Sequence, residues 1–320
     1  MTVAPRCSVV IRAFNEEEHI GRLLSGILEQ SMDDHEIVLV DSGSTDATLS
    51  IASRFPVRVV SIPPEEFSFG RSLNLGCRGA RGEMIVVASA HVYPVYPDWL
   101  EQLMAPFSDP AVGLVYGKQR GSATTRFSEH QVLAKWFPAD SVARQSHAFC
   151  NNANAAVRRS LWEQHPYDEE LPGLEDVEWA AWALSQGHGI AYSSGAEVVH
   201  VHDETPRAVY NRYRREAMAL KTIRSQEHFR FADFVRLYCS NVVSDLWHAL
   251  QEHCASKVAG EILWFRWMQF WGTYTGFRRA GPMTSQLKQA FYYPCGFERR
   301  QPAATRKIAP IDYGHGGLGA

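Results

Sequence analysis

One stretch of the chain joins a fully apolar segment to a group of polar side chains. Residues 37–40 are Ile, Val, Leu and Val, and they lead into Asp41, Ser42 and the sequence Gly-Ser-Thr-Asp. Such a run is typical of a parallel strand buried on both faces, and ligands bind beyond the carboxyl ends of these strands. Carboxylates and hydroxyls placed there could bind a nucleotide. By spacing alone, Asp41 could equally be the acid of an ordinary strand-to-helix turn.

The chain around this stretch alternates between strand and helix patterns. Residues 8–14 form a second apolar run, and the polar residues 15–18 that follow are typical of a capping box at a helix start. Helical spacing then continues through Ile20, Leu23, Leu24, Ile27 and Leu28. Further strands are predicted at residues 57–62, 83–89 and 112–117. This order predicts an α/β fold with right-handed crossovers and a mostly parallel sheet.

A series of motifs resembles glycosyltransferase family 2, whose members have the GT-A fold. The motifs are Ala-Phe-Asn-Glu at 13–16, Val-Asp-Ser-Gly-Ser-Thr-Asp at 40–46, Gly-Arg-Ser-Leu-Asn-Leu-Gly at 70–76, Asn-Asn-Ala-Asn at 151–154 and Gly-Leu-Glu-Asp at 173–176. Several motifs in this order are more specific than any one of them. The resemblance implies a GT-A-type nucleotide-binding sheet flanked by helices in residues 1–204, and a nucleotide-diphosphate sugar as donor.

The resemblance also implies which side chains line the nucleotide pocket. They are Ala13, Phe14, Asn15, Glu16, Asp41, Ser42, Arg71 and Ser89. In the family, the acid at the position of Asp41 contacts the nucleobase. Arg71 would form a further wall, because a guanidinium can donate to a base or to diphosphate oxygens. The alternative for Arg71 is an ordinary solvated helix residue.

The site that neutralises the diphosphate departs from the family pattern. Family members hold a divalent cation with Asp-x-Asp after the fourth strand, whereas this chain has Ser89-Ala90-His91 there. Alternation along residues 197–202 places His200 and His202 on one face of a strand, and a histidine in this region resembles one that completes the metal shell in related enzymes. We therefore expect either a rebuilt site of His91, His200 and His202, which would favour Mn²⁺ over Mg²⁺, or replacement of the cation by Arg or Lys.

A pair of carboxylates opens a later helix. Glu175 and Asp176 precede a helical pattern that Gly187 would end as a C-cap. Acids at a helix start often serve only as caps. The resemblance implies instead that Asp176 is the general base that deprotonates the acceptor hydroxyl, supported by Glu175, so that a single displacement inverts the anomeric centre.

The acceptor would meet neutral amides and aromatic rings. Asn152 and Asn154 lie between an apolar segment and the helix-prone residues 155–162, and amides suit sugar hydroxyls because they both donate and accept. Local turn bonds are the alternative for these amides. Trp179 could line an acceptor groove, although packing in the core is the commoner reason for such an aromatic.

The character of the chain changes near residue 205. Residues 205–280 hold twelve Lys or Arg and six Asp or Glu, whereas the whole chain has a net charge of −3. Thr205 and Pro206 predict a helix start, and the aromatic face of residues 263–274 could lie on an anionic membrane, pack on the catalytic domain, or meet another copy of the chain. Residues 205–285 are thus predicted to be a basic helical appendage, and residues 286–320 a mobile tail.

Composition narrows the class of protein. The net charge gives no reason to expect a nucleic-acid partner, and six cysteines without a CxxC pair favour a reducing cytoplasm. No leader and no long apolar run is recognised. We therefore expect a cytoplasmic enzyme, at most peripheral on the inner face of the membrane, that passes a sugar to a glycan or lipid-linked acceptor. The amino-acid sequences of the motifs look most like those of bacterial surface-polysaccharide transferases such as rhamnosyltransferases. The alternative is a catalytically silent nucleotide-sugar-binding scaffold of a polysaccharide synthase complex.

Overall fold

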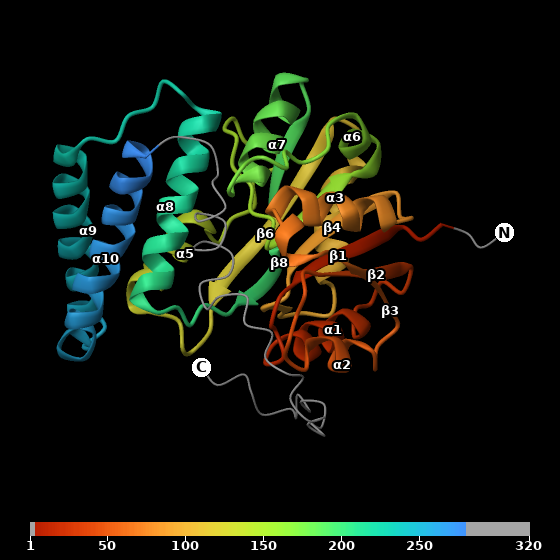
Figure 1. The fold of residues 1–320 in the computed structure, drawn as a ribbon, viewed down its shortest axis with the longest axis horizontal. Coiled ribbons are helices and arrows are strands. Elements are labelled where there is room, and N and C mark those ends of the chain that lie inside the picture. The colour runs from red at the N-terminus through yellow and green to blue at the C-terminus, as the bar shows by residue number, and fades with distance from the viewer. Residues whose placement is uncertain (1–3, 280–320) are drawn as a thin grey trace.

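A single eight-stranded sheet organises the chain, as seen in a computed structural model that describes residues 4–279 (Figure 1). Its strand order is β3-β2-β1-β4-β7-β6-β8-β5. The strands are β1 (Cys7–Ala13), β2 (His35–Asp41), β3 (Val57–Ser61), β4 (Met84–Ser89), β5 (Val92–Pro94), β6 (Val112–Gly121), β7 (Asn154–Arg158) and β8 (Gly189–His200). The first four strands pair in parallel, as do β6 and β8, whereas β7 and β5 are antiparallel to their neighbours. The predicted α/β fold with a mostly parallel sheet is confirmed.

Helices cover both faces of the sheet. In Figure 1, α1 (Ile20–Leu28) and α2 (Thr48–Ala52) lie below it, and α3 (Phe69–Gly79), α6 (Arg159–Gln164) and α7 (Glu175–Ser185) lie above it. The remaining α-helices are α4 (Trp99–Met104), α5 (Phe127–Trp136), α8 (Pro206–Ile223), α9 (Phe231–Gln251) and α10 (Ala255–Arg278), with short 3-10 helices at Pro64–Glu66 and Ala105–Ser108. Each face has its own apolar core, one around Leu23 and Trp99 and the other around Leu73 and Trp179.

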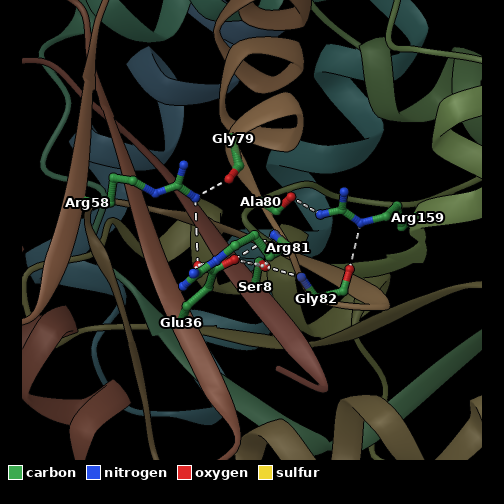
Figure 2. A network of polar contacts seen from close by, with 8 residues as sticks. All are labelled: Ser8, Glu36, Arg58, Gly79, Ala80, Arg81, Gly82 and Arg159. Carbon is green, nitrogen blue, oxygen red and sulfur yellow. Dashed lines mark hydrogen bonds and ion pairs between the residues drawn. The ribbon is translucent and has the colours of Figure 1, made fainter. Parts of the chain in front are cut away.

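A polar network connects the N-terminal ends of neighbouring strands of the sheet (Figure 2). Glu36 at the start of β2 accepts hydrogen bonds from the Ser8 hydroxyl at 2.7 Å and from the Arg81 backbone N–H at 2.6 Å. The Ser8 hydroxyl in turn accepts from the Gly82 N–H at 2.8 Å, and Arg159 donates to the Gly82 carbonyl at 2.7 Å. Burial opposes ionisation of Glu36, but the hydrogen bonds from Ser8 and Arg81 outweigh it and lower the pKa of its carboxyl. The network therefore fixes the register of β1, β2 and β4.

Two local predictions are wrong. The helix predicted to open at the capping box of residues 15–18 begins only at Ile20, and His19 makes no side-chain cap. Residues 155–162 were expected to favour a helix throughout, yet Ala155, Ala156 and Val157 belong to β7 and only Arg159 starts a helix. In both places contacts with distant strands and loops override the local pattern. The predicted helix end is confirmed, because Gly187 has a φ of 84° immediately after Gln186, the C-cap residue of α7.

Helices α8, α10 and α9 form successive layers that extend away from the sheet (Figure 1). The predicted helix start is confirmed, since the Thr205 hydroxyl accepts from the Ala208 N–H. A Cβ on Gly272 would lie 2.6 Å from the Tyr210 carbonyl oxygen, so this glycine permits close contact of α10 with α8. The expected division at residue 205 stays a prediction, and the tail predicted at residues 286–320 lies outside the described residues. None of the helices within residues 4–279 combines the length and apolarity needed to cross a membrane.

A buried ion pair joins the outer helices to α5. The Arg266 guanidinium donates to both Asp245 carboxylate oxygens, at 2.7 and 2.8 Å, and both side chains are almost fully buried. The Ser128 hydroxyl donates to the same carboxylate at 2.6 Å.

We predict that Asp245→Asn lowers the free energy of unfolding by about 3–5 kcal/mol, because Arg266 would remain buried without an ionised partner. Denaturant unfolding followed by circular dichroism measures this. The double variant Asp245→Leu with Arg266→Met should recover most of the loss. A cost below about 1 kcal/mol for the single variant, typical of exposed pairs, would contradict a desolvated ion pair.

Candidate functional site

The loops that follow β1 and β2 bind each other at the carboxyl edge of the sheet. Asn15 has a φ of 54°, and its side-chain oxygen accepts from the Thr45 N–H at 2.8 Å. The Asn15 N–H donates to the Ser44 hydroxyl at 2.9 Å, and the Glu16 N–H donates to the Thr48 hydroxyl at 2.7 Å. These contacts explain why the polar residues 15–18 are not a helix cap. Their hydrogen-bonding groups hold the second loop instead.

Asp41 shapes its own loop from a buried position. Its carboxylate accepts from the Gly43 N–H at 3.1 Å and from the Ser44 N–H at 3.2 Å. The Ser42 hydroxyl donates to the Ala13 carbonyl at 3.2 Å, so the two strand ends are tied together. These contacts match the turn alternative for Asp41, while leaving its expected contact with a base as a prediction.

Three histidines, His91, His200 and His202, converge beside these loops, as the first of the two alternatives expected for the diphosphate site requires. One ring nitrogen from each lies within 4.8 Å of the others. The ring centroids of His200 and His202 are 3.9 Å apart, and the His91 ring stacks on His200 at 5.0 Å. Ser89 lies at the same point, with its hydroxyl 3.1 Å from His91 Nε2.

The second nitrogen of each histidine is bound to an oxygen. His200 Nδ1 lies 2.8 Å from Gln119 Oε1, His202 Nδ1 lies 2.6 Å from Glu129 Oε1, and His91 Nδ1 lies 2.8 Å from Glu16 Oε1. These oxygens accept the Nδ1 protons and leave each Nε2 with a lone pair. The buried Nε2 of His200 has no hydrogen-bond partner among residues 4–279. This donor set fits a divalent transition-metal ion, because it provides three imidazole nitrogens and the oriented outer partners that metal-bound histidines usually have.

Burial and charge set the protonation of this cluster. Burial, followed by the charges of His202, His91 and Arg212, lowers the pKa of His200 well below its ordinary value. Burial opposes ionisation of Glu129, but Arg212 at 2.7 Å and the hydrogen bond from His202 outweigh it and lower its pKa to about 2. The cluster therefore presents neutral imidazole at His200 beside a carboxylate that remains ionised.

The carboxylates Glu175 and Asp176 lie beside the first residues of β7. Asp176 accepts from the Asn152 N–H at 3.0 Å and from the Val177 N–H at 2.8 Å. Glu175 accepts from the Arg12 guanidinium at 3.3 Å. The residue before the pair, Leu174, has a φ of 57°, a conformation that costs a branched side chain energy and that is often retained at functional sites.

The two carboxylates differ in their surroundings. Burial, reinforced by the neighbouring Glu175 carboxylate, raises the pKa of Asp176 to about 7, although the Asn152 and Val177 N–H groups and Arg12 oppose the rise. Glu175 has the guanidinium as a direct partner. A carboxyl with such a pKa can take up and return a proton near neutral pH.

The histidines and the carboxylates lie at the same end of the sheet. The Ser89 N–H donates to the Ala153 carbonyl at 3.3 Å, and the adjacent Asn152 N–H binds Asp176. β4 carries the histidine side of this edge and β7 the carboxylate side, so pairing of the two strands positions both groups.

Sequence reasoning missed a group of cations around Phe69. Arg12 lies over one part of this ring at 4.7 Å from its centroid, and Arg215 of α8 lies 4.6 Å from the same centroid. Arg12 is at the end of β1, so its position before the Ala-Phe-Asn-Glu motif was a usable signal. Nothing local could have shown that Arg215, more than 140 residues away from Phe69 in the chain, would reach the same ring.

The residues predicted to bind the acceptor have mixed outcomes. Trp179 is fully buried and donates to the His165 carbonyl at 2.7 Å, so it packs in the core and offers no surface to an acceptor. Asn154 is also fully buried, where it accepts from Trp99 at 2.9 Å and donates to the Ala196 carbonyl at 2.8 Å. Both acceptor assignments are therefore corrected to structural roles. Asn152 stays beside the carboxylates, 3.4 Å from Glu175.

Arg71 lies at the start of α3, partly exposed. It forms ion pairs with Glu66 and Glu169. The structure therefore gives it carboxylate partners, and its expected contact with the nucleotide remains a prediction.

Comparison with known proteins identifies the family of this chain. Residues 8–165 match the model described as glycosyl transferase family 2. The chain belongs to glycosyltransferase family 2. An O-antigen chain rhamnosyltransferase of Salmonella typhimurium is 24% identical over 65% of this chain and 70% of its own length. One of Salmonella anatum is 26% identical over 58% of this chain and 62% of its own length.

Solved structures of other glycosyltransferases share the GT-A fold. A mannosyltransferase of Pyrobaculum calidifontis, in complex with GDP-Man and Mn²⁺, has a TM-score of 0.58 and 22% identity over 86% of this chain and 85% of its own. A glucosyl-3-phosphoglycerate synthase of Mycobacterium tuberculosis, in complex with Mn²⁺, UDP and glucosyl-3-phosphoglycerate, has a TM-score of 0.53 and 21% identity over 70% of this chain and 81% of its own. At these identities the likeness concerns the fold of this family 2 glycosyltransferase.

The raised pKa of Asp176 predicts how stability depends on pH. Between its ordinary value near 3.8 and about 7, the folded chain keeps a proton that the unfolded chain loses, so stability falls as pH rises through this window. Asp176→Asn stays neutral. Its melting temperature minus that of the wild type should therefore be smallest at the acidic end of the window and largest above it.

Differential scanning calorimetry across this range measures the trend, which is unaffected by any constant loss of one hydrogen bond. Asp140→Asn, at an exposed loop position, is the control and should show no such trend. A difference for Asp176→Asn that does not change with pH would contradict the raised pKa.

Proposed function

We propose that this family 2 glycosyltransferase transfers a sugar from a nucleotide-diphosphate donor to a hydroxyl group of a glycan or lipid-linked acceptor, with inversion. The observation that carries the proposal is the buried Asp176 carboxyl, held by two backbone N–H groups beside Glu175. The relatives named as O-antigen chain rhamnosyltransferases support a surface polysaccharide as the product.

The nucleotide would bind at the joined loops after β1 and β2. Their shared hydrogen bonds pre-organise Asn15, Glu16 and the Asp41 loop, which reduces the ordering cost of binding. Phe14 and the edge of β4 at Ser89 would complete the pocket. Arg71 would reach it only by exchanging its present carboxylate partners for the donor.

Asp176 would act as the general base. It accepts the proton of the acceptor hydroxyl while that oxygen forms a bond to the anomeric carbon, and the bond from this carbon to the donor phosphate oxygen breaks. Glu175, fixed by Arg12, raises the affinity of Asp176 for the proton through its charge. Asn152 holds the carboxylate in place through its backbone N–H.

We propose that His91, His200 and His202 hold a divalent cation in this chain, with Mn²⁺ favoured over Mg²⁺. A cation there would supply positive charge to the departing diphosphate. The bound Mn²⁺ in the Pyrobaculum calidifontis complex supports a metal in this fold. The alternative is neutralisation by Arg12 and Arg215 around Phe69.

A scaffold that binds nucleotide sugars without transfer is the competing proposal. The replacement of the family's Asp-x-Asp by Ser89-Ala90-His91 favours it. The buried Asp176 argues against it, because a silent binder would retain the energetic cost of a desolvated carboxyl without using it.

Asp176→Asn should separate the two proposals. We expect loss of transfer by roughly 10²–10⁴-fold, since the variant lacks a general base, with unchanged binding of UDP, GDP or dTDP. Transfer is followed as nucleoside diphosphate released from a panel of donors with membrane extract as acceptor, and binding by calorimetry. Asp140→Asn should match the wild type. Equal transfer by wild type and Asp176→Asn would refute the base assignment.

Calorimetric titration with Mn²⁺ tests the histidine cluster. Alanine at His91, His200 or His202 should weaken Mn²⁺ binding at least tenfold, and Glu129→Gln, which alters the partner of His202, by about 10–100-fold. His147→Ala, at an exposed loop position, is the matched control. Undiminished Mn²⁺ binding by the cluster variants would place the cation outside this cluster, whereas a wild type that binds no Mn²⁺ would favour neutralisation by Arg12 and Arg215.

A further inference from the structure

Helices α9 and α10 expose several large apolar side chains. Of the twelve large hydrophobic residues that are exposed within residues 4–279, seven lie on these two helices. They are Phe231, Val235, Val243, Trp247 and Leu250 of α9 and Leu263 and Trp267 of α10. We call these seven residues the outer apolar face. Val243 is 67% exposed and Trp247 is 61% exposed, far more than a side chain packed between two helices would be.

Packing within the helical layers does not account for this face. α9 contacts its neighbours through buried side chains that include Phe234, Val242 and Asp245, whereas Val243 and Trp247 are mostly exposed. α10 buries Arg266 and Gln269, whereas Leu263 and Trp267 remain partly exposed. A group of exposed large apolar side chains on two neighbouring helices is a feature of interaction sites.

A basic hollow adjoins one end of the outer apolar face. It has a volume of about 300 Å³ and is lined by Lys221, His228, Phe229, Arg230 and Phe277. Arg230 immediately precedes Phe231, the first residue of the face, so the hollow and the face are continuous. Lys221 donates to the Phe277 carbonyl at 2.8 Å, which holds its ammonium group at the hollow.

The surroundings of the hollow are strongly basic. Residues 221–236 and 278–279 contain six Lys or Arg and two Asp or Glu. The two acids, Glu227 and Asp233, pair with Arg224 and Arg236, which leaves the positive charge of Lys221, Arg230, Arg278 and Arg279 in excess. An apolar, tryptophan-containing face bordered by cations is complementary to an anionic bilayer interface.

We propose that the outer apolar face and the basic hollow dock the protein on an anionic phospholipid membrane, with the hollow receiving a lipid phosphate. A second copy of the chain fits less well, because a twofold contact through this face would bring both basic rims into one interface with few acids to balance them. The surface acts independently of the proposed transfer, but α8, which lies between this layer and the site, would then keep the site near a lipid-linked acceptor.

Vesicle co-sedimentation tests the proposal with the full chain and no donor. The wild type should sediment with vesicles of phosphatidylcholine mixed with phosphatidylglycerol, less with phosphatidylcholine alone, and less at high salt. Val243→Ser combined with Trp247→Ser should weaken binding roughly tenfold or more, because apolar area enters the interface. Arg278→Gln combined with Arg279→Gln should remove most of the preference for the anionic vesicles.

Tyr96→Ser is the matched control, since Tyr96 is an exposed aromatic residue outside α9 and α10 and should not affect binding. Unchanged nucleotide binding by calorimetry verifies that each variant is folded. The proposal would be overturned if the protein sedimented equally with neutral and anionic vesicles and if neither double variant changed this sedimentation. A wild-type dimer that the Val243→Ser and Trp247→Ser variant converts to a monomer, without any vesicle binding, would identify a second copy as the occupant. Loss of vesicle binding with retained sugar transfer would affect this surface alone and leave the proposed function standing.

Discussion

Parallel pairing of β1 with β2 and β4 holds three strand ends level, and every group of the site depends on this. Ala13 lies opposite Asp41, and Arg12 lies opposite Ser89. The register is fixed at the N-terminal ends of these strands, where the Glu36 carboxylate accepts hydrogen bonds from Ser8 and Arg81. A shift by one residue would turn each terminal side chain to the other face of the sheet. The polar network far from the site is therefore what allows the two loops to meet.

Buried charge is tolerated at this edge because each carboxylate has a specific set of donors. Glu129 has Arg212 and His202, and Glu175 has Arg12. Asp176 has two backbone N–H groups but no ion-pair partner within the described part of the chain. This difference in partners distinguishes Glu129 and Glu175, which organise the structure, from Asp176, whose carboxyl changes protonation near neutral pH. Such unequal environments within a small region are the usual means by which one site holds both a fixed charge and a proton acceptor.

The sequence predicted what depends on short-range periodicity and on ordered motifs. Strand positions, the spacing of Leu23 and Leu24 and the cap at Gly187 follow from local pattern. The meeting of His91 with His200 and His202 was expected from the family resemblance, as one of two alternatives. What it missed depends on tertiary contact. Asn15 looked like a helix cap because its partner Thr45 lies in another loop, and Arg215 reaches Phe69 only after α8 packs. Trp179 and Asn154 have suitable chemistry for an acceptor, but only the fold reveals that they are covered.

The position of α8 bears on how this enzyme can be divided or recombined. α8 presses on the glycines of α10 from one side, and from the other it supplies Arg212 to Glu129 and Arg215 to Phe69. A chain cut before α8 would keep the whole sheet and still leave the buried Glu129 without its guanidinium. Exchange of the outer helices between relatives would therefore have to preserve α8 together with the sheet.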